Sequence, residues 1–272
     1  MKNKSWIVFS ILSGIFIYWG FHQILIIPTF PADHWDWIVP TTELLEYIKF
    51  RFQNLGAFTL ANGVFILGVS LTGLHKRERW AWVTLVVVPL YILLLTGIIY
   101  WLFFITLPLA MFAGWALWAS RGELQPTVSN RRGLGWIIVF IVGMLVLYFA
   151  YDAFFVIPTL DVRDPERGWD WLTTAPTHIE YIKLYFRVYG IHVFAFATMT
   201  LITVFFGLRE GYRSAWKMLC LVPLLVIIHV FFWPWLTPLL IGVALLAGIG
   251  LGLAYPKVLE AQNGEQISPS HV

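Results

Sequence analysis

Runs of about 20 apolar residues recur along the whole chain, and they limit its fold more than any other feature. The stretch LLIGVALLAGIGLGLAY at residues 239–255 is typical and carries no charged side chain. Lipid offers no hydrogen-bond partner to a free backbone amide, so such runs form helices that cross the bilayer. Charged residues make up only 12% of the chain, against about 25% in soluble domains. The sequence therefore predicts an all-α, multi-pass membrane protein.

A polar segment flanked by tryptophans occurs twice. WDWIVPTTELLEYIKFRF at residues 35–52 and WDWLTTAPTHIEYIKLYF at residues 169–186 are identical at eight of eighteen aligned positions. At the same offset of 134 residues, the match continues as far as Trp101 and Trp235. A gene duplication explains this pattern, and it predicts two copies of one structural unit.

Each copy contains four apolar segments, so the chain is predicted to cross the membrane eight times. The segments lie at about residues 5–27, 52–74, 80–99 and 104–120, and again at about 134–157, 186–208, 214–233 and 237–255. The sequence thus divides into a first four-helix repeat at residues 1–120, a cytoplasmic linker at 121–133, a second four-helix repeat at 134–256 and a polar, disordered cytoplasmic tail at 257–272.

Basic residues concentrate at one side of the eight-span arrangement, at the N-terminus and in turns such as HKRER at residues 75–79. The positive-inside rule then places both termini in the cytoplasm and the protein in the cell membrane. Because four spans is an even number, the two repeats are predicted to be parallel, related by a pseudo-two-fold axis along the membrane normal. This placement accounts for the net charge of +3 without a nucleic-acid partner. Cys220 is the single cysteine, which excludes disulfides and thiolate metal sites.

The repeated segment is predicted to lie on the outer face, where it begins a helix. Thr41, Thr42 or Thr177 is the expected N-cap, and the helix then runs through Glu-Tyr-Ile-Lys into the second span of each repeat. Glutamate and lysine three residues apart can pair on one helix face. In one interpretation the segment is an interfacial anchor, with its tryptophans at headgroup depth.

A second interpretation is a ligand-binding site, because ionisable residues inside membrane spans are costly and often functional. Those of the second repeat fall at similar depth and are predicted to meet in one outward-facing cavity: Asp152, His178, Glu180, Lys183, Arg187, His192 and His229. The first repeat offers a weaker set of His22, Glu46 and Lys49.

Several chemistries are open to this set. His178, His192, His229 and Asp152 offer nitrogen and oxygen ligands, but no ligand pair has the spacing of a metal motif, so neither a metal nor a cofactor is predicted. Acid–base catalysis on a lipid would use Glu180 or Asp152 as the proton-transfer group. The leading hypothesis is a non-catalytic protein that binds or moves a lipid-like or isoprenoid molecule. A structural or assembly protein without ligand is the remaining alternative, and the sequence leaves open whether the protein forms a homo-oligomer.

The stretch RFQNLGAFTLANGVFILGVSLTGLHKRERWAW at residues 51–82 resembles the second span, basic turn and following tryptophan of small bacterial four-span membrane proteins, the DoxX-like and related groups. The resemblance covers about fifty residues of each repeat and implies a four-helix membrane unit. Those families share no established activity, so the resemblance implies no site residues.

Overall fold

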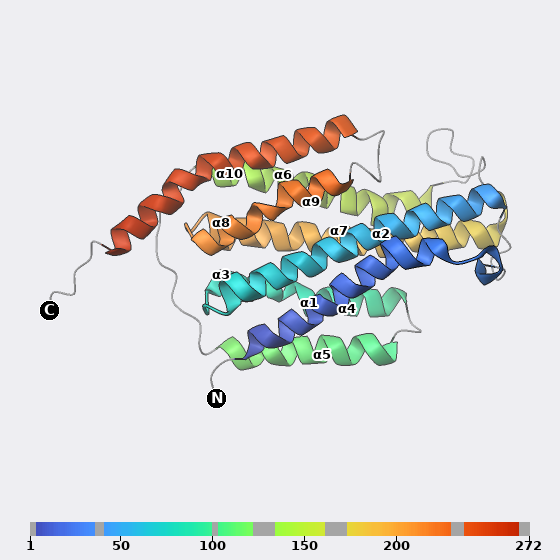
Figure 1. Cartoon of the computed structure of the whole chain (residues 1–272), viewed down its shortest axis with the longest axis horizontal. Coiled ribbons are helices and arrows are strands. Elements are labelled where there is room, and N and C mark those ends of the chain that lie inside the picture. The colour runs from blue at the N-terminus through green and yellow to red at the C-terminus, as the bar shows by residue number, and fades with distance from the viewer. Residues whose placement is uncertain are drawn as a thin grey trace.

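The computed structural model of the chain describes residues 4–35, 41–99, 103–121, 134–160, 173–229 and 237–266. The regular elements within these ranges are all helices (Figure 1). Among the described residues, seven helices are long and apolar enough to cross a membrane. The prediction of an all-α, multi-pass membrane protein is therefore confirmed.

The first half of the chain consists of two long helices followed by two shorter spans. α1 (Ser5–Phe21) continues through a π-helical turn, η1 (His22–Ile26), and a 3-10 turn, η2 (Ile27–Thr29), followed by η3 (Ala32–Trp35). Then come α2 (Thr42–Val69) with the π-helical turn η4 (Ser70–Leu74), α3 (Arg79–Leu85), α4 (Val87–Ile98) and α5 (Phe103–Ser120).

Apart from η3, the second half has the same order of elements, displaced by 130 residues through η8 and by 134 residues from α7. It consists of α6 (Gly135–Tyr151), η7 (Asp152–Val156), η8 (Ile157–Thr159), α7 (Pro176–Thr203), η9 (Val204–Leu208), α8 (Arg213–Leu219), α9 (Leu221–Ile228) and α10 (Thr237–Gln266). α10 extends through Gln266, into the tail for which the sequence predicts disorder, and residues 267–272 lie outside the described part of the chain.

The third span of each half is interrupted. α3 gives way to α4 at Val86, and α8 gives way to α9 at Cys220, three residues before Pro89 and Pro223 respectively. Proline has no N–H for the bond to the residue four positions earlier, and its ring crowds that carbonyl. Pro89 and Pro223 therefore account for the two breaks. α8 and α9 fall within the apolar segment predicted at about residues 214–233, whose last residues lie outside the described part of the chain, and they are not among the seven candidate spans.

The two helix starts differ in their caps. The backbone N–H of Leu44 donates to Thr41 Oγ1 at 3.2 Å, which confirms Thr41 as the N-cap of α2. α7 has Ala175 at the N-cap and Pro176 at its first position, so the prediction of Thr177 as a cap is wrong. Proline opens this helix instead, because its fixed φ suits the first turn and it has no N–H to satisfy.

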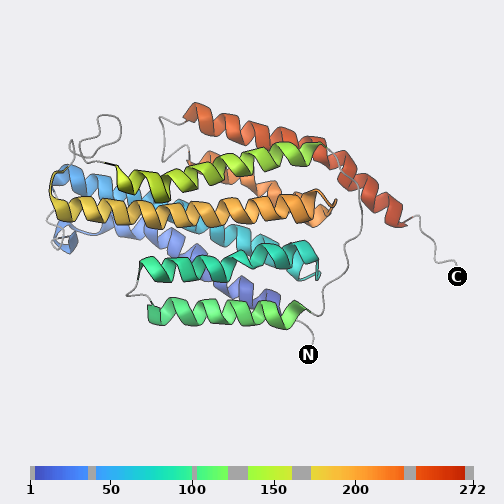
Figure 2. The same cartoon turned by 180° about the vertical axis from the view of Figure 1, so that it is seen from behind.

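α2 and α7 pack against each other at the centre of the bundle, α2 also against α1, and α7 against α4 and α6 (Figures 1 and 2). With their π-helical ends, each of the two spans covers 33 residues. At 1.5 Å per residue this is about 50 Å, well beyond a hydrocarbon core of about 30 Å. The starts of α2 and α7 therefore project past α4 and α5, at what we call the distal end (Figure 1). The proximal end holds the turns at residues 75–78 and 209–212, and both chain termini lie toward it.

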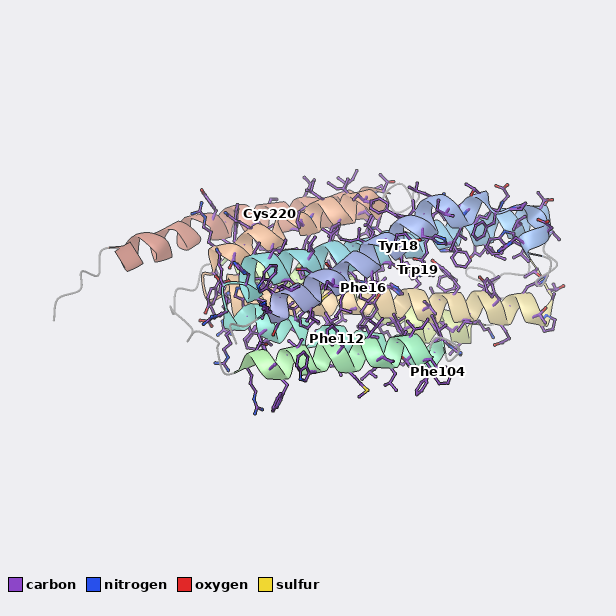
Figure 3. The ribbon with its side chains drawn as sticks, turned by 60° about the horizontal axis from the view of Figure 1, so that its bottom comes forward. Phe16, Tyr18, Trp19, Phe104, Phe112 and Cys220 are labelled. Atoms are coloured by element: carbon purple, nitrogen blue, oxygen red, sulfur yellow. The ribbon has the colours of Figure 1, made fainter. Side chains whose placement is uncertain are left out.

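The outer surface of the bundle is apolar. Tyr18 on α1 is 67% exposed and Phe104 on α5 is 86% exposed. Figure 3 shows Phe104 on the outer side of α5. Exposed apolar side chains in such number suit lipid as the surrounding solvent.

Candidate functional site

The repeated Glu-Tyr-Ile-Lys motif lies in the first turns of α2 and α7, at the distal end. Ile48 and Ile182 are each only 2% exposed, and both belong to one cluster of buried side chains between the helices. Glu46 and Glu180 lie two residues earlier and are exposed. Burial of the isoleucines therefore sets the rotation of each helix and directs the glutamates outward.

A pocket lies between the two helices at this level, with room for on the order of one water molecule. Its lining comes from the two repeated segments: Tyr47, Ile48, Arg51 and Phe52 of α2, and Tyr181, Ile182 and Tyr185 of α7. Tyr47, Ile48 and Arg51 are equivalent to the three residues of α7. The motif thus contributes its tyrosine and isoleucine to the pocket, and its charged residues lie elsewhere.

Arg51 is the charged residue of this lining, and aromatic rings surround it. Its guanidinium carbon lies 4.6 Å from the ring centre of Tyr47, 4.9 Å from that of Phe186 and 5.8 Å from that of Tyr185. Each cation–π contact of this kind contributes roughly 0.5–2 kcal/mol, more where water is excluded. Nε and Nη1 are shielded from solvent while the residue as a whole is half-buried, so the rings lie against a partly desolvated positive charge.

The sequence analysis missed Arg51. The second segment has Tyr185 at the equivalent position, so the arginine does not stand out in the alignment. A usable signal was present, because Arg51 follows Tyr47 by four residues and Ile48 by three, which places all three on one helix face. Ile48, the apolar residue of the Glu-Tyr-Ile-Lys motif, could have identified this face as the buried one.

The charged residues that the sequence predicted as ligands lie on other faces. Glu180 is exposed and pairs with Lys183 at 3.5 Å, which confirms the predicted glutamate–lysine pair in α7. Arg187 and Glu46 are exposed, and Lys49 is half-buried. None of these five described residues lines the distal pocket. His178 lies at the start of α7, where Nδ1 is 2.9 Å from Thr173 Oγ1.

The two remaining histidines of the predicted set are buried in the bundle. His192 is 4% exposed; its Nδ1 bonds to the carbonyl of Val188 at 2.8 Å, and its ring meets Tyr91 edge-on at 5.3 Å. His229 is 5% exposed, with Nδ1 on the carbonyl of Leu225 at 2.7 Å and its ring 3.8 Å from that of Phe58. Local backbone bonds and ring contacts account for both positions.

His22 and Asp152 occupy equivalent places, each opening the π-helical turn that ends the first helix of its half. The ring of His22 stacks on Trp19 at 5.1 Å, while Asp152 is half-buried. Within the described ranges, no three His, Cys, Asp or Glu side chains approach closely enough to hold a metal ion. The predicted set is therefore divided among the outer faces of α2 and α7, the core and the two π-helical turns.

Glu78, at the proximal end, is a second position that the sequence analysis missed. Its Oε2 accepts from Trp80 Nε1 at 2.6 Å and from the hydroxyl of Ser214, which lies in α8. Burial raises the pKa of this carboxyl above its ordinary value of 4.5, against the lowering effect of Ser214, Trp80 and Lys76. Glu78 thus joins a turn of the first half to a helix of the second through a partly desolvated carboxylate.

We expect this carboxyl to make the thermal stability of the protein pH-dependent. An acid whose pKa is raised on folding binds more protons in the folded state, so it favours that state at low pH and this contribution is lost as pH rises from about 4.5 through the raised pKa. Melting curves of the detergent-solubilised wild type and of Glu78→Gln check this. The amide cannot ionise, so the Tm of the variant relative to wild type should rise with pH across that window. A difference independent of pH would contradict the shifted pKa.

Comparison of the chain with protein-family models, curated protein sequences and solved structures finds no match. The resemblance to DoxX-like proteins stays a prediction.

Proposed function

We propose that the chain is a cell-membrane protein with eight spans, built as two parallel four-helix repeats with both termini in the cytoplasm. The equal spacing of helix bounds in the two halves supports the repeats. Trp82 Nε1 donates to the carbonyl of Leu117, and Trp216 Nε1 donates to that of Leu251, each at 2.9 Å and at equivalent positions. The basic turns at the proximal end support the orientation.

In this proposal the distal pocket binds an amphiphilic small molecule, a lipid or isoprenoid with a phosphate or carboxylate head. The observation that carries it is Arg51, held among aromatic rings in a pocket between α2 and α7. Leu95, Ile98 and Ile99, at the distal end of α4, pack against the same cluster. The pocket therefore lies where α4 ends, at the level at which a headgroup meets the acyl region.

Guanidinium chemistry defines the head of this ligand. Arginine presents planar N–H donors that match two oxygens of a carboxylate or phosphate, and such charge-assisted bonds are among the strongest in proteins. The pocket admits only the edge of a head group, with space for about one water molecule. The apolar chain of the ligand then lies along the outside of the bundle, where the surface is already lipid-facing.

Acid–base catalysis has less support than binding. Glu180 is exposed and paired with Lys183, so it lacks the desolvated setting that would adjust a carboxyl for proton transfer. A purely structural role of the pocket remains as an outcome of the binding test.

The test compares Arg51→Gln with Arg187→Gln, which removes an exposed charge at the same end of the bundle. A hydrogen bond to a charged group contributes about 1.5–3 kcal/mol, so Arg51→Gln should lower the affinity for an anionic lipid about tenfold or more. Native mass spectrometry with added phosphatidylglycerol or phosphatidylcholine measures this. We expect retention of the anionic lipid by wild type and Arg187→Gln, and its loss in Arg51→Gln. Equal retention of the two lipids by all three proteins would assign the pocket a structural role instead.

A further inference from the structure

Polar side chains are buried along α2 and α7, inside the bundle. Asn54 and Asn62 lie on α2, and His192, Thr200 and Thr203 lie on α7. All five are at most 4% exposed. We call this set the α2–α7 seam. Its members lie far from the loops, in the spans themselves.

Part of the seam is satisfied by the protein. Asn62 Nδ2 donates to the carbonyl of His192 at 2.9 Å, which joins α2 to α7. The hydroxyl of Thr203 lies 3.1 Å from that of Thr84 on α3. Tyr91 of α4 lies beside the Asn62 side chain and meets the His192 ring edge-on. The seam therefore contains organised polar contacts between elements of both halves.

Other seam atoms find no hydrogen-bond partner among the residues that the structure describes. These are Nδ2 and Oδ1 of Asn54 and the hydroxyl oxygen of Thr200. Oδ1 of Asn62 and the hydroxyl of Tyr91 also lack a bond of good geometry, although the two side chains are neighbours. Asn54 is 0% exposed, so both ends of a fully buried amide need partners. Buried polar groups are nearly always hydrogen-bonded, and lipid supplies no substitute. A ligand with both donor and acceptor capacity is required at these positions.

The chemistry of the seam limits what that ligand is. Residues 54–69 of α2 and residues 188–203 of α7 include no charged side chain, so a metal cation or an ionic head group would lack a counter-charge there. Aromatic rings fill the surroundings: Phe58 lies 5.2 Å from Tyr189 and 3.8 Å from His229 between ring centres. The remaining class of ligand is a small neutral molecule that both donates and accepts hydrogen bonds. Water has these properties.

We propose that ordered water molecules occupy the α2–α7 seam, bound by Asn54, by Asn62 with Tyr91, and by Thr200. Asn54 and Asn62 are eight residues apart, about 12 Å along the helix, so these are separate levels within the membrane. Asn54 follows Arg51 by three residues on the same face of α2, and the bound waters continue the polar lining of the distal pocket into the bundle. This inference stands independently of the proposed amphiphile.

The experiment is X-ray radiolytic footprinting of the full-length protein in lipid nanodiscs, with isotope-labelled water as the oxygen source. Bound water becomes hydroxyl radical in place and oxidises the side chains that it touches. We expect labelling of Tyr91 and His192, which are 2% and 4% exposed. Phe65, on the same helix as the asparagines and 0% exposed in the apolar cluster, is the matched control and should stay unlabelled.

After correction for intrinsic reactivity, Tyr91 should be oxidised several-fold faster than Phe65, and Asn62→Leu should lower the Tyr91 rate toward that of Phe65. The wild-type comparison does not depend on the variant, so it decides the matter if Asn62→Leu fails to fold. Labelling of Tyr91 and His192 as slow as that of Phe65 would overturn the proposal and show a dry seam.

Discussion

Trp80→Ala is expected to lower the thermal stability of the protein more than any other single truncation of a side chain proposed here. Trp80 is 0% exposed and its indole lies against two glycines, where a Cβ on Gly73 would approach it to 2.6 Å and one on Gly207 to 3.3 Å. Truncating a buried tryptophan to alanine costs about 3–5 kcal/mol. The change also removes the N–H that bonds Glu78. Melting curves in mild detergent measure the effect as a drop in Tm.

Two further variants separate the loss of the buried ring from the loss of the N–H that bonds Glu78. Trp115 on α5 is 58% exposed, so Trp115→Ala should change stability by about 0.5 kcal/mol or less. Trp80→Phe keeps most of the buried ring and loses the donor to Glu78, so its Tm should fall between those of wild type and Trp80→Ala. If Trp80→Ala and Trp115→Ala have the same Tm, then the buried indole does not stabilise the packing at the proximal end.

Trp80 and Glu78 have no like residues at the equivalent positions of the second half, which limits what the duplication predicts. The second half has Ser214 at the position equivalent to Trp80, and Tyr212 at the position equivalent to Glu78. One indole therefore reaches both Gly73 and Gly207, and one carboxylate bonds across to Ser214. Aligned sequences indicate equivalent positions in each half but cannot show that a single side chain serves both halves.

Most of the fold could be predicted because the signals are local. Apolar runs set the spans, Thr41 caps α2, and Pro89 and Pro223 place the breaks in the third spans. The π-helical turns that end α1, α2, α6 and α7 were not predicted, since π-turns have no local sequence signature and depend on packing.

The candidate site was harder to predict, because depth and helix rotation are separate properties. Glu180 and Arg187 lie at the same level along α7 as the pocket, yet both are exposed, since the burial of Ile182 turns that face of α7 outward. His192 faces inward but is bound to its own helix through Val188. Arg51 faces the pocket with Ile48. A sequence analysis that began from the apolar residues of the motif would have found the lining.

The second large effect is expected from Gly20→Ala, at the contact of α1 with α2. A Cβ at Gly20 would lie 2.6 Å from the backbone nitrogen of Leu60 and 2.9 Å from the carbonyl oxygen of Gly56. Backbone atoms cannot rotate away, so the two helices must separate along this contact. Overpacking of this kind costs about 3 kcal/mol, at the upper end of the usual range. The separation also lengthens the neighbouring bond from Thr59 Oγ1 to Gln23 Oε1, which is 3.0 Å in the structure.

Gly14→Ala is the matched control, because it adds the same methyl group on the same helix where no atom lies within 4 Å. Alanine favours helix over glycine by about 1 kcal/mol, so this variant should melt at the wild-type temperature or slightly above it. Differential scanning fluorimetry of both variants in one detergent gives the comparison. A low Tm for Gly20→Ala beside an unchanged Gly14→Ala places the cost in the contact of the two helices. Equal Tm values would mean that α1 and α2 do not approach as closely as the structure has them.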